Sequence, residues 1–496
     1  MSVIPHFEPY FTLPSQRDAL ARRLAPRSAP VSCDQLGRIL TLFDDVARSG
    51  DDAVLRATRA HDGVELSSVR VDPREVAADV DALPGTLRSA IDTALGNIRE
   101  VNARLVPADT DAGVRPGTRV GERYRPLDSV AVYVPTRKGP LISTALMLIG
   151  AARVAGVARI AMVAPPLASG RWEPQTFAAG LIAGASEFYV GNGVALIAAL
   201  GRGTSSISRV DGIVGPGPAG IAAAMGIAAC LGSRTVVGLG PTDCAILADE
   251  SANATNVALD LMAEAEHGKD SSALLVTPSA ALATRVRGEL TRQLARVPAA
   301  RREVVEHVFG ADGFGALVVA PWDEAVALLD RYAPEHLMLA GPAAEAQAPR
   351  IRHAGELLLG ASTPFAAANY AIGVSAVLPT NGFARSHSAV TARDFMRLST
   401  TARLDADALA TLAPSIVALA TAEGLPCHAA SIAERARWRP RCNTSGNHGA
   451  RLARRRRRQT ATRSRRPAPR RRASGGRGCS RNGAASRCRS SPARAS

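Results

Sequence analysis

The chain has few cysteines, and none of them is spaced for a disulfide framework or a cysteine-rich metal site. Seven cysteines are scattered singly through 496 residues. Secreted domains that depend on disulfides are short and much denser in cysteine, and structural zinc sites usually bring two cysteines within a few positions of each other. We therefore expect a protein of a reducing compartment, the cytoplasm.

A long uncharged apolar run is also missing. The most apolar stretch, residues 141–166, is interrupted by Arg153 and Arg159, so its pattern predicts a helix followed by a strand rather than a membrane span. The opening residues, MSVIPH, show no basic segment followed by an apolar one, so we expect no secretory signal. Association with a membrane is accordingly not expected.

Acidic residues and lysine are absent from the end of the chain. Residues 439–496 contain nineteen arginines and no lysine, aspartate or glutamate, although the whole chain carries a formal net charge of only +16. The body before residue 439 is therefore mildly acidic. Its charge does not favour binding to a nucleic-acid backbone, so nucleic acid is an expected partner only of the terminal segment.

The arginine-rich segment 439–496 also has almost no large apolar residues, so it cannot bury a core and is predicted to be disordered. One interpretation is an arm for nucleic acid or an anionic membrane, although no aromatic residues interleave the arginines. The other is a tail without function, because a GC-rich gene read in a shifted frame gives this composition.

The body of the chain alternates between two kinds of segment. From residue 129 to 240, short β-branched runs alternate with alanine-rich helical patterns, and a second alternation follows it. Such alternation is typical of βαβ units around a parallel sheet. In the second alternation we expect strands at residues 245–247, 273–276, 316–319 and 356–359. The sequence therefore predicts an α/β protein with two doubly wound units and smaller helical elements at 1–120 and 386–438.

Two carboxylate–histidine clusters are the main candidates for chemistry. Glu335 and His336 are adjacent, and such a pair can divide acid–base work because imidazole titrates near neutrality. Glu264 and His267 lie three residues apart at the end of a predicted helix, so they share one face, as a metal site requires. Alone, each cluster also fits an ordinary histidine on a solvated helix face or at a helix end.

Glycine-rich turns follow two of the predicted strands, at Gly191-Asn192-Gly193 and Gly215-Pro216-Gly217. Backbone amides in such turns can bind the pyrophosphate of a dinucleotide. Neither turn is a G-x-G-x-x-G motif, and tight turns need glycine for conformational reasons alone.

An ordered set of motifs between residues 30 and 430 is more specific than any one of them. The set resembles the histidinol dehydrogenase family, whose members are homodimeric, zinc-dependent enzymes. They oxidise an amino alcohol to an amino acid in two steps, each of which passes a hydride to NAD. The motifs are, in order, Tyr133-Val134-Pro135, Pro140-Leu141-Ile142-Ser143-Thr144, Gly215-Pro216-Gly217, Gly240-Pro241-Thr242-Asp243, Ala248-Asp249-Glu250, Glu264-Ala265-Glu266-His267-Gly268, Ala333-Pro334-Glu335-His336-Leu337, Val377-Leu378-Pro379-Thr380 and Gly382-Phe383-Ala384-Arg385.

The resemblance implies two incomplete Rossmann-like domains with small helical satellite domains. Residues 1–128 would form an N-terminal helical region and the start of the first α/β domain, and 129–240 the first Rossmann-like domain. Residues 241–385 would form the second, which carries the catalytic and metal residues. Residues 386–438 would be a small helical C-terminal or dimerisation domain, followed by the tail 439–496.

The resemblance also assigns roles to residues. His336 would remove the alcohol proton, and Glu335 would activate water against the aldehyde. One zinc ion per subunit would be held by Glu264, His267, Asn369 and His428, the last of these from across a dimer interface or from the same chain. NAD would contact Tyr133, Gly215 and Gly217. The substrate would contact Lys138, Thr242, Arg385 and Glu423.

The chain departs from the family at several of these positions. Glu264 stands where the family usually has glutamine, and Asn369 stands where it has aspartate, so the total charge of the metal site is preserved. Lys138, Phe365 and Ala376 replace a serine, an acidic residue and a histidine of the substrate pocket. Ala195 and Pro218 replace amide residues of the dinucleotide site and cannot make their side-chain hydrogen bonds.

These departures leave three hypotheses open. The family default is the oxidation of L-histidinol to L-histidine, a step of amino-acid biosynthesis. A paralogue that resembles sulfopropanediol dehydrogenase would use Lys138 to bind an anionic alcohol. A third possibility is a catalytically silent member that binds NAD or nucleic acid.

Overall fold

The computed structural model describes residues 10–24, 31–236, 240 and 242–437, without the side chains of Lys138 and Arg437. The chain divides into two compact units, Met1–Arg403 and Leu404–Ser496. The arginine-rich segment 439–496 lies outside the described residues, so the prediction that it is disordered remains a prediction.

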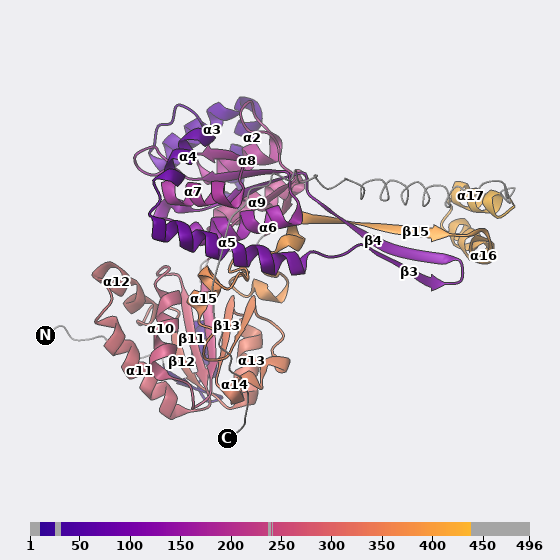
Figure 1. The fold of residues 1–496 in the computed structure, drawn as a ribbon. Helices are drawn as coiled ribbons and strands as arrows, with labels where there is room; N and C mark the ends of the chain where they lie inside the picture. Colours follow the sequence, from indigo (N-terminus) through magenta and orange to yellow (C-terminus); the bar gives the residue numbers. More distant parts are fainter. Residues whose placement is uncertain (1–9, 25–30, 237–239, 241, 438–496) are drawn as a thin grey trace, which may run out of the picture. The chain divides into compact units, whose positions relative to one another are not determined.

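The first sheet of the larger unit has six strands in the order β2-β7-β6-β5-β8-β9. It lies among the helices labelled α2 to α9 in Figure 1. Its strands pair in parallel except for β2, which runs antiparallel to β7. The strands are β2 (Arg70–Val71), β5 (Ser129–Tyr133), β6 (Arg159–Ala164), β7 (Glu187–Val190), β8 (Gly212–Val214) and β9 (Arg234–Thr235).

Helices cover both faces of this sheet. Alternate residues of β5 explain why: Val130 and Val132 pack into the core on one face, and Ala131 and Tyr133 into the core on the other. The first core is shared with α4 (Pro73–Asp81), α5 (Gly85–Leu105), α6 (Ile142–Ala155) and α7 (Pro174–Ala183). The second is shared with α2 (Cys33–Ser49), α3 (Asp51–Ala57), α8 (Gly193–Arg202) and α9 (Ala219–Cys230).

The second sheet also has six strands, all parallel, in the order β1-β12-β11-β10-β13-β14. Its strands are β1 (Tyr10–Thr12), β10 (Asp243–Ala248), β11 (Ser272–Thr277), β12 (Ala316–Val319), β13 (His336–Ala340) and β14 (Glu356–Leu359). Its helices are α1 (Arg17–Arg23), α10 (Ala254–Ala265), α11 (Ala280–Leu294), α12 (Ala299–Val308), α13 (Trp322–Tyr332), α14 (Pro342–Glu345) and α15 (Phe365–Tyr370). The prediction of two α/β units around parallel sheets is therefore confirmed.

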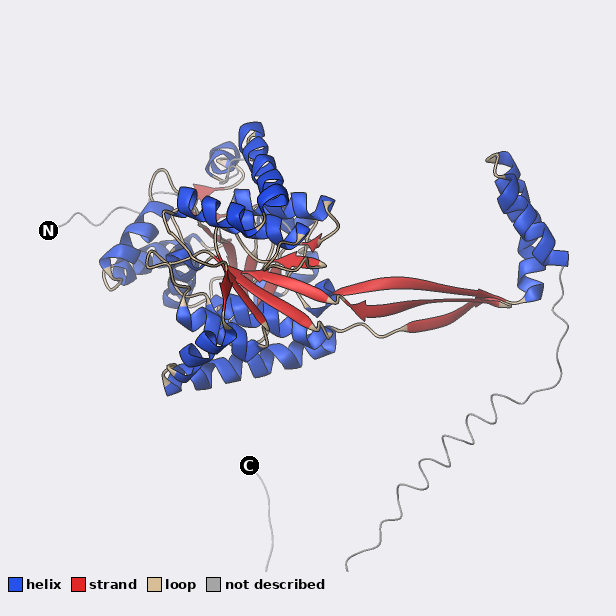
Figure 2. Cartoon of the chain, turned by 90° about the horizontal axis from the view of Figure 1, so that it is seen from above, coloured by secondary structure: helices blue, strands red, loops and turns tan. Residues whose placement is uncertain are grey.

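The third sheet has three strands, in the order β15-β4-β3, and forms the long ribbon visible in Figure 2. Its strands are β3 (Thr110–Arg115), β4 (Thr118–Pro126) and β15 (Met396–Leu404). All six residues of β3 are exposed. Helical elements were expected at residues 1–120 and 386–438, and the strands β3 and β15 correct that expectation.

The smaller unit is described as far as residue 437. It contains α16 (Ala406–Ala422) and α17 (Pro426–Arg437), which pack against each other. Asp405 caps α16, because its carboxylate accepts a hydrogen bond from the Ala408 N–H. Across the described helices, none has both the length and the apolar character needed to cross a membrane.

Candidate active site

The predicted catalytic pair lies at the amino end of β13. His336 is the first residue of this strand and Glu335 precedes it, and the side chains are 3% and 8% exposed. The neighbouring strands β10 and β14 begin at Asp243 and Glu356, and the parallel register sets Glu356 beside His336. The carboxylates of Glu335 and Glu356 therefore lie beside the His336 imidazole, and Asp243 lies beside Glu335.

Asp243 holds Glu335 in place through two hydrogen bonds. The Glu335 N–H donates to Asp243 Oδ1 at 2.6 Å, and the Asp243 N–H donates to Glu335 Oε2 at 3.1 Å. The other Asp243 oxygen accepts from the Asn381 N–H at 2.7 Å. This arrangement leaves Glu335 Oε1 3.5 Å from His336 Nε2.

The two ring nitrogens of His336 have different neighbours. Nδ1 lies 2.6 Å from Glu356 Oε1, whereas Nε2 faces Glu335. The ring of Phe365 packs against the imidazole at an angle of 67°, with 5.7 Å between the centroids. The histidine is therefore held at Nδ1 and on one side of its ring.

Burial and neighbouring charges shift the pKa values of this pair. Burial raises the pKa of Glu335 to about 7, and the charge and hydrogen bond of His336 only partly oppose it. Burial by itself lowers the pKa of His336, but the charges of Glu335 and Glu264 outweigh it and raise the pKa well above its ordinary value. The pKa values of the two groups are therefore linked, because the charge on each group shifts the pKa of the other.

The predicted metal ligands of the larger unit come together in part. Glu264 is buried in the last turn of α10, and Asn369 on α15 donates from Nδ2 to Glu264 Oε1 at 2.8 Å. The second oxygen, Glu264 Oε2, is buried without a hydrogen-bond partner among the described residues. His267 Nδ1 lies 3.8 Å from that oxygen. No group of three or more histidine, cysteine or acidic side chains in the described chain is arranged to hold a metal ion.

This ligand set nevertheless fits a divalent cation chemically. His267 Nδ1 lies 3.1 Å from the Ala263 carbonyl, so it carries the proton and leaves Nε2 as the nitrogen that can bind a metal. A cation would also satisfy the buried Glu264 Oε2, which otherwise lacks a partner in the described structure. Asp260, one turn earlier on α10, has a pKa raised to about 7 by burial and by the Glu264 charge.

Two predicted residues belong to the smaller unit. Glu423 follows the last residue of α16, and His428 lies in the first turn of α17. Both side chains are exposed within the smaller unit. Their roles as substrate and metal ligands remain predictions.

The predicted substrate residues of the larger unit are only partly described. Thr242 immediately precedes β10, next to Asp243. Arg385 lies in a short 3-10 turn, Phe383–Arg385, is exposed and donates to the Arg331 carbonyl. Lys138 lies in the turn Thr136–Lys138 after β5, but its side chain is outside the described part of the structure.

The predicted dinucleotide residues lie at the carboxyl ends of strands in the first sheet. Tyr133 ends β5, and burial raises the pKa of its hydroxyl. Gly215 follows β8 with φ +146°, and a Cβ there would overlap the Tyr133 carbonyl oxygen; a Cβ at Gly217 would come 2.6 Å from Ile221. Both glycines therefore have a packing reason to be glycine, and their contact with NAD remains a prediction.

Sequence reasoning assigned no role to Asp243 and Glu356. Asp243 belonged to a quoted motif, and Glu356 opened a predicted strand that is otherwise leucine. The signal that could have found both residues is a single carboxylate at the first position of an otherwise apolar strand.

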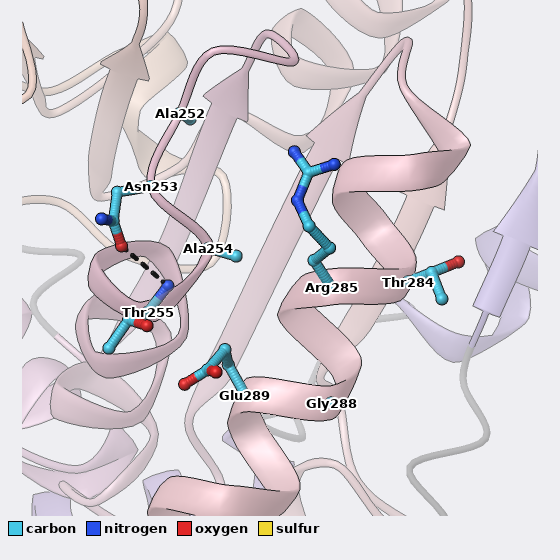
Figure 3. A pocket seen from close by; sticks show the side chains of 8 residues that line it. All are labelled: Ala252, Asn253, Ala254, Thr255, Thr284, Arg285, Gly288 and Glu289. Atoms are coloured by element: carbon cyan, nitrogen blue, oxygen red, sulfur yellow. Dashed lines mark hydrogen bonds between the residues drawn. The ribbon is translucent and has the colours of Figure 1, made fainter.

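A surface hollow of about 540 Å³ lies apart from this cluster, between the start of α10 and the middle of α11 (Figure 3). Asn253 at its edge accepts from the Thr255 N–H and so caps α10. None of the predicted site residues lines it. Its lining residues are Ala252, Asn253, Ala254, Thr255, Thr284, Arg285, Gly288 and Glu289.

The model of the family described as histidinol dehydrogenase matches residues 27–436. The chain belongs to the histidinol dehydrogenase family. It is 40% identical over 399 residues to histidinol dehydrogenase of Synechocystis sp., covering 79% of this chain and 91% of that one. To the enzyme of Caulobacter vibrioides it is 36% identical over 421 residues, 82% of this chain and 94% of the relative.

A solved structure is also similar. The crystal structure of histidinol dehydrogenase from Elizabethkingia anophelis has a TM-score of 0.81 and 29% identity, and the match covers 87% of this chain and 98% of that one. The α/β fold with two parallel sheets is thus that of the histidinol dehydrogenase family, and the expected resemblance is confirmed. The chain is an NAD-dependent dehydrogenase of this family, and the family implies both NAD and zinc as cofactors.

Proposed function

We propose that this family member oxidises a primary alcohol to a carboxylate through an aldehyde, with L-histidinol as its substrate and L-histidine as its product. The observation that carries the proposal is the buried Glu335–His336 pair, clamped by Asp243 and Glu356. Bound NAD would supply the hydride acceptor for both oxidations, and a bound zinc ion would supply a Lewis acid for the substrate oxygen.

The residues of the pair divide the proton transfers. His336 takes the hydroxyl proton at Nε2 as the alcohol becomes an aldehyde. Glu335 then takes a proton from water at Oε1 as the water attacks the aldehyde carbon. Their burial excludes bulk water and strengthens the charge interactions that these steps need.

The charge of the site supports a cationic substrate. Asp243, Glu264 and Glu335 are at most 6% exposed, whereas no lysine or arginine is among the buried residues of the described chain. Buried carboxylates require compensating positive charge, which a metal ion and a protonated amino alcohol supply. The rival substrate, an anionic alcohol, is supported by the cation at Lys138 and by the substrate-contacting groups lost at Phe365 and Ala376.

The substrate experiment measures NADH formation by zinc-loaded protein with histidinol and with a panel of anionic three-carbon alcohols. Histidinol turnover that is lost in His336→Ala supports the proposal. Turnover of an anionic alcohol alone, lost again in Lys138→Ser, would replace it with the paralogue hypothesis. Absence of turnover together with an NAD-induced thermal shift would favour the silent binding protein.

We further propose that zinc, one ion per subunit of a cytoplasmic homodimer, is held by Glu264, His267, Asn369 and His428. The orphaned Glu264 Oε2 and the free Nε2 of His267 support this set. Carboxylate is a better zinc ligand than amide, although the Asn369 amide is what now satisfies Glu264 Oε1.

Asn369→Asp should therefore lower the stability of the zinc-free protein but raise its affinity for zinc. The new carboxylate would repel Glu264 in zinc-free protein and lower its Tm, but it would bind zinc more tightly. Calorimetric zinc titration and melting in a chelator measure the two effects, and Asn256→Asp on the same helix as Glu264 is the control. A fall in both zinc affinity and Tm would contradict the assignment.

A further inference from the structure

Glu356 is a buried carboxylate that the proposed reaction does not use. It begins β14, where three leucines follow it, and its side chain is 9% exposed. A buried carboxylate is costly unless charged or polar groups compensate it. The contact that compensates Glu356 is therefore informative about its role.

That contact is the imidazole of His336. Glu356 Oε1 lies 2.6 Å from His336 Nδ1, a length typical of a charge-assisted hydrogen bond. The other oxygen, Oε2, is buried and has no hydrogen-bond partner within the described structure. Among the described residues, its ion pair is with His336 rather than with a lysine or arginine.

The backbone keeps Glu356 at this position. Its N–H donates to the Glu335 carbonyl at 2.9 Å, and the Gly355 N–H donates to the Pro334 carbonyl at 2.9 Å. A Cβ at Gly355 would come 2.5 Å from the Glu335 carbonyl oxygen, so the close approach requires glycine. Backbone hydrogen bonds therefore hold the start of β14 against residues 334–335, next to the proposed catalytic pair.

We propose that Glu356 is a positioning residue that fixes the tautomer and the ring orientation of His336. A carboxylate only accepts hydrogen bonds, so Nδ1 must carry a proton and the lone pair of the neutral ring lies on Nε2. Nε2 is the nitrogen that faces Glu335 Oε1. The lone pair is thereby directed to the side where the proposed base must accept the hydroxyl proton.

This inference rests on the proposed role of His336 as the base. Without Glu356 the ring can hold its proton on either nitrogen and can rotate, so a smaller fraction of molecules is ready to react. Binding of the substrate does not involve Nδ1, so its KM should not change. Glu356→Ala is expected to lower kcat roughly 10- to 100-fold, the usual effect of removing a partner that orients a functional histidine.

The test combines kinetics with a spectroscopic readout on the full-length, zinc-loaded protein. Nitrogen NMR of histidine-labelled protein reports which ring nitrogen carries the proton, and the signal that disappears in His336→Gln identifies this residue. At a pH above the raised pKa of His336, where the ring is neutral, wild-type protein should show the proton on Nδ1. Glu356→Ala should show a mixture of tautomers, lower kcat and unchanged KM, whereas Glu356→Asp should recover part of the kcat.

Two further variants keep the outcomes separate. Glu345→Gln, a change at a carboxylate outside the site, should match wild type in every readout. Glu356→Met has nearly the length of the native side chain and no comparable hydrogen-bond acceptor, and it replaces the alanine variant if that one fails to fold. An unchanged tautomer and unchanged kcat without the carboxylate would overturn the inference. Wild-type protein that oxidises no alcohol would instead overturn the proposed function, and the NMR comparison would still decide whether Glu356 controls the ring.

Discussion

Asp243 shows how one residue can serve the site without facing the substrate. Its two carboxylate oxygens accept from the N–H groups of Glu335 and Asn381, and its own N–H reaches the Glu335 carboxylate. One aspartate therefore connects the strand β10, the proposed catalytic residue Glu335 and the loop after residue 380. We expect it to matter for both stability and turnover.

Asp243→Asn replaces one accepting oxygen by an amide that cannot accept. One buried N–H then lacks its partner, which costs about 1–3 kcal/mol of stability. We expect a lower unfolding midpoint in urea and a lower kcat, because Glu335 loses its fixed position. Asp323→Asn, at an exposed ion pair with Arg350, is the matched control and should change neither quantity. Equal effects of both variants would contradict the role of Asp243 in fixing the position of Glu335.

The raised pKa of Glu335 predicts how stability depends on pH. Its ordinary value is 4.5 and its value in the folded protein is about 7. Between these values the folded state binds more protons than the unfolded state, so this group contributes stability that is present below 4.5 and lost as pH rises through about 7.

Glu335→Gln should remove that contribution to the pH dependence. Relative to wild type, the variant should gain stability as the pH rises from 5 to 8, because it no longer holds a buried group that must ionise. Thermal melts of zinc-free protein across this range measure the difference. A constant difference at every pH would show that the pKa of Glu335 is not raised.

Residue spacing along the chain predicted part of the site and missed the rest. Glu335 with His336, and Glu264 with His267, were found because each pair is local in sequence. Asp243 and Glu356 reach the same cluster only through the register of β10, β13 and β14, which brings residues 20 and 92 positions apart into contact. Register depends on the whole sheet, so spacing alone could not supply these partners.

Among the elements, the turn after β8 has the strictest backbone requirement near the first sheet. Gly215 has a positive φ, and any side chain there would overlap the Tyr133 carbonyl of the neighbouring strand. The turn and the end of β5 thus approach each other more closely than two ordinary residues could. This packing holds whether or not a dinucleotide binds beside it.

Gly215→Ala should therefore destabilise the protein by more than about 1 kcal/mol, because strain and overlap add. Gly220→Ala, five residues later inside α9, is a direct comparison, since nothing lies within 4 Å of its would-be Cβ. That change should raise stability by up to about 1 kcal/mol through helix propensity. Chemical denaturation measures the change in the free energy of unfolding for each variant. A change of the same sign in both would contradict the prediction.

Strands inside the parallel sheets were predictable because they are buried on both faces and read as apolar runs. Residues 245–247 and 316–319 of the expected set fall within β10 and β12. The ribbon of β3, β4 and β15 was missed because its strands are exposed and carry charged residues, so they have no apolar pattern. The short β1 was missed because its partner β12 lies about three hundred residues away.

At the scale of the whole molecule, the family match and the charge both distinguish residues 27–436 from the arginine-rich segment 439–496. The family match ends at residue 436, and the nineteen arginines begin at residue 439. The mildly acidic body contains all the residues assigned to the reaction. The tail can therefore be tested independently of the enzyme.

Removal of residues 439–496 should leave kcat and KM unchanged and should abolish any salt-sensitive retention on immobilised RNA. Steady-state kinetics and a salt-gradient elution of the full and shortened chains measure the two properties. RNA retention that persists after the deletion would place nucleic-acid binding in the body and revive the binding-protein hypothesis.

The pairing of β1 with β12 has a consequence for how the protein is made. Residues 10–12 are synthesised about three hundred residues before their partner strand Ala316–Val319. Until then the apolar side chain of Leu13, which is 3% exposed in the finished fold, has no core to enter. The second sheet can thus be completed only late in translation, and the segment that closes it must wait unpaired, open to chaperones and to aggregation, while three hundred residues are added.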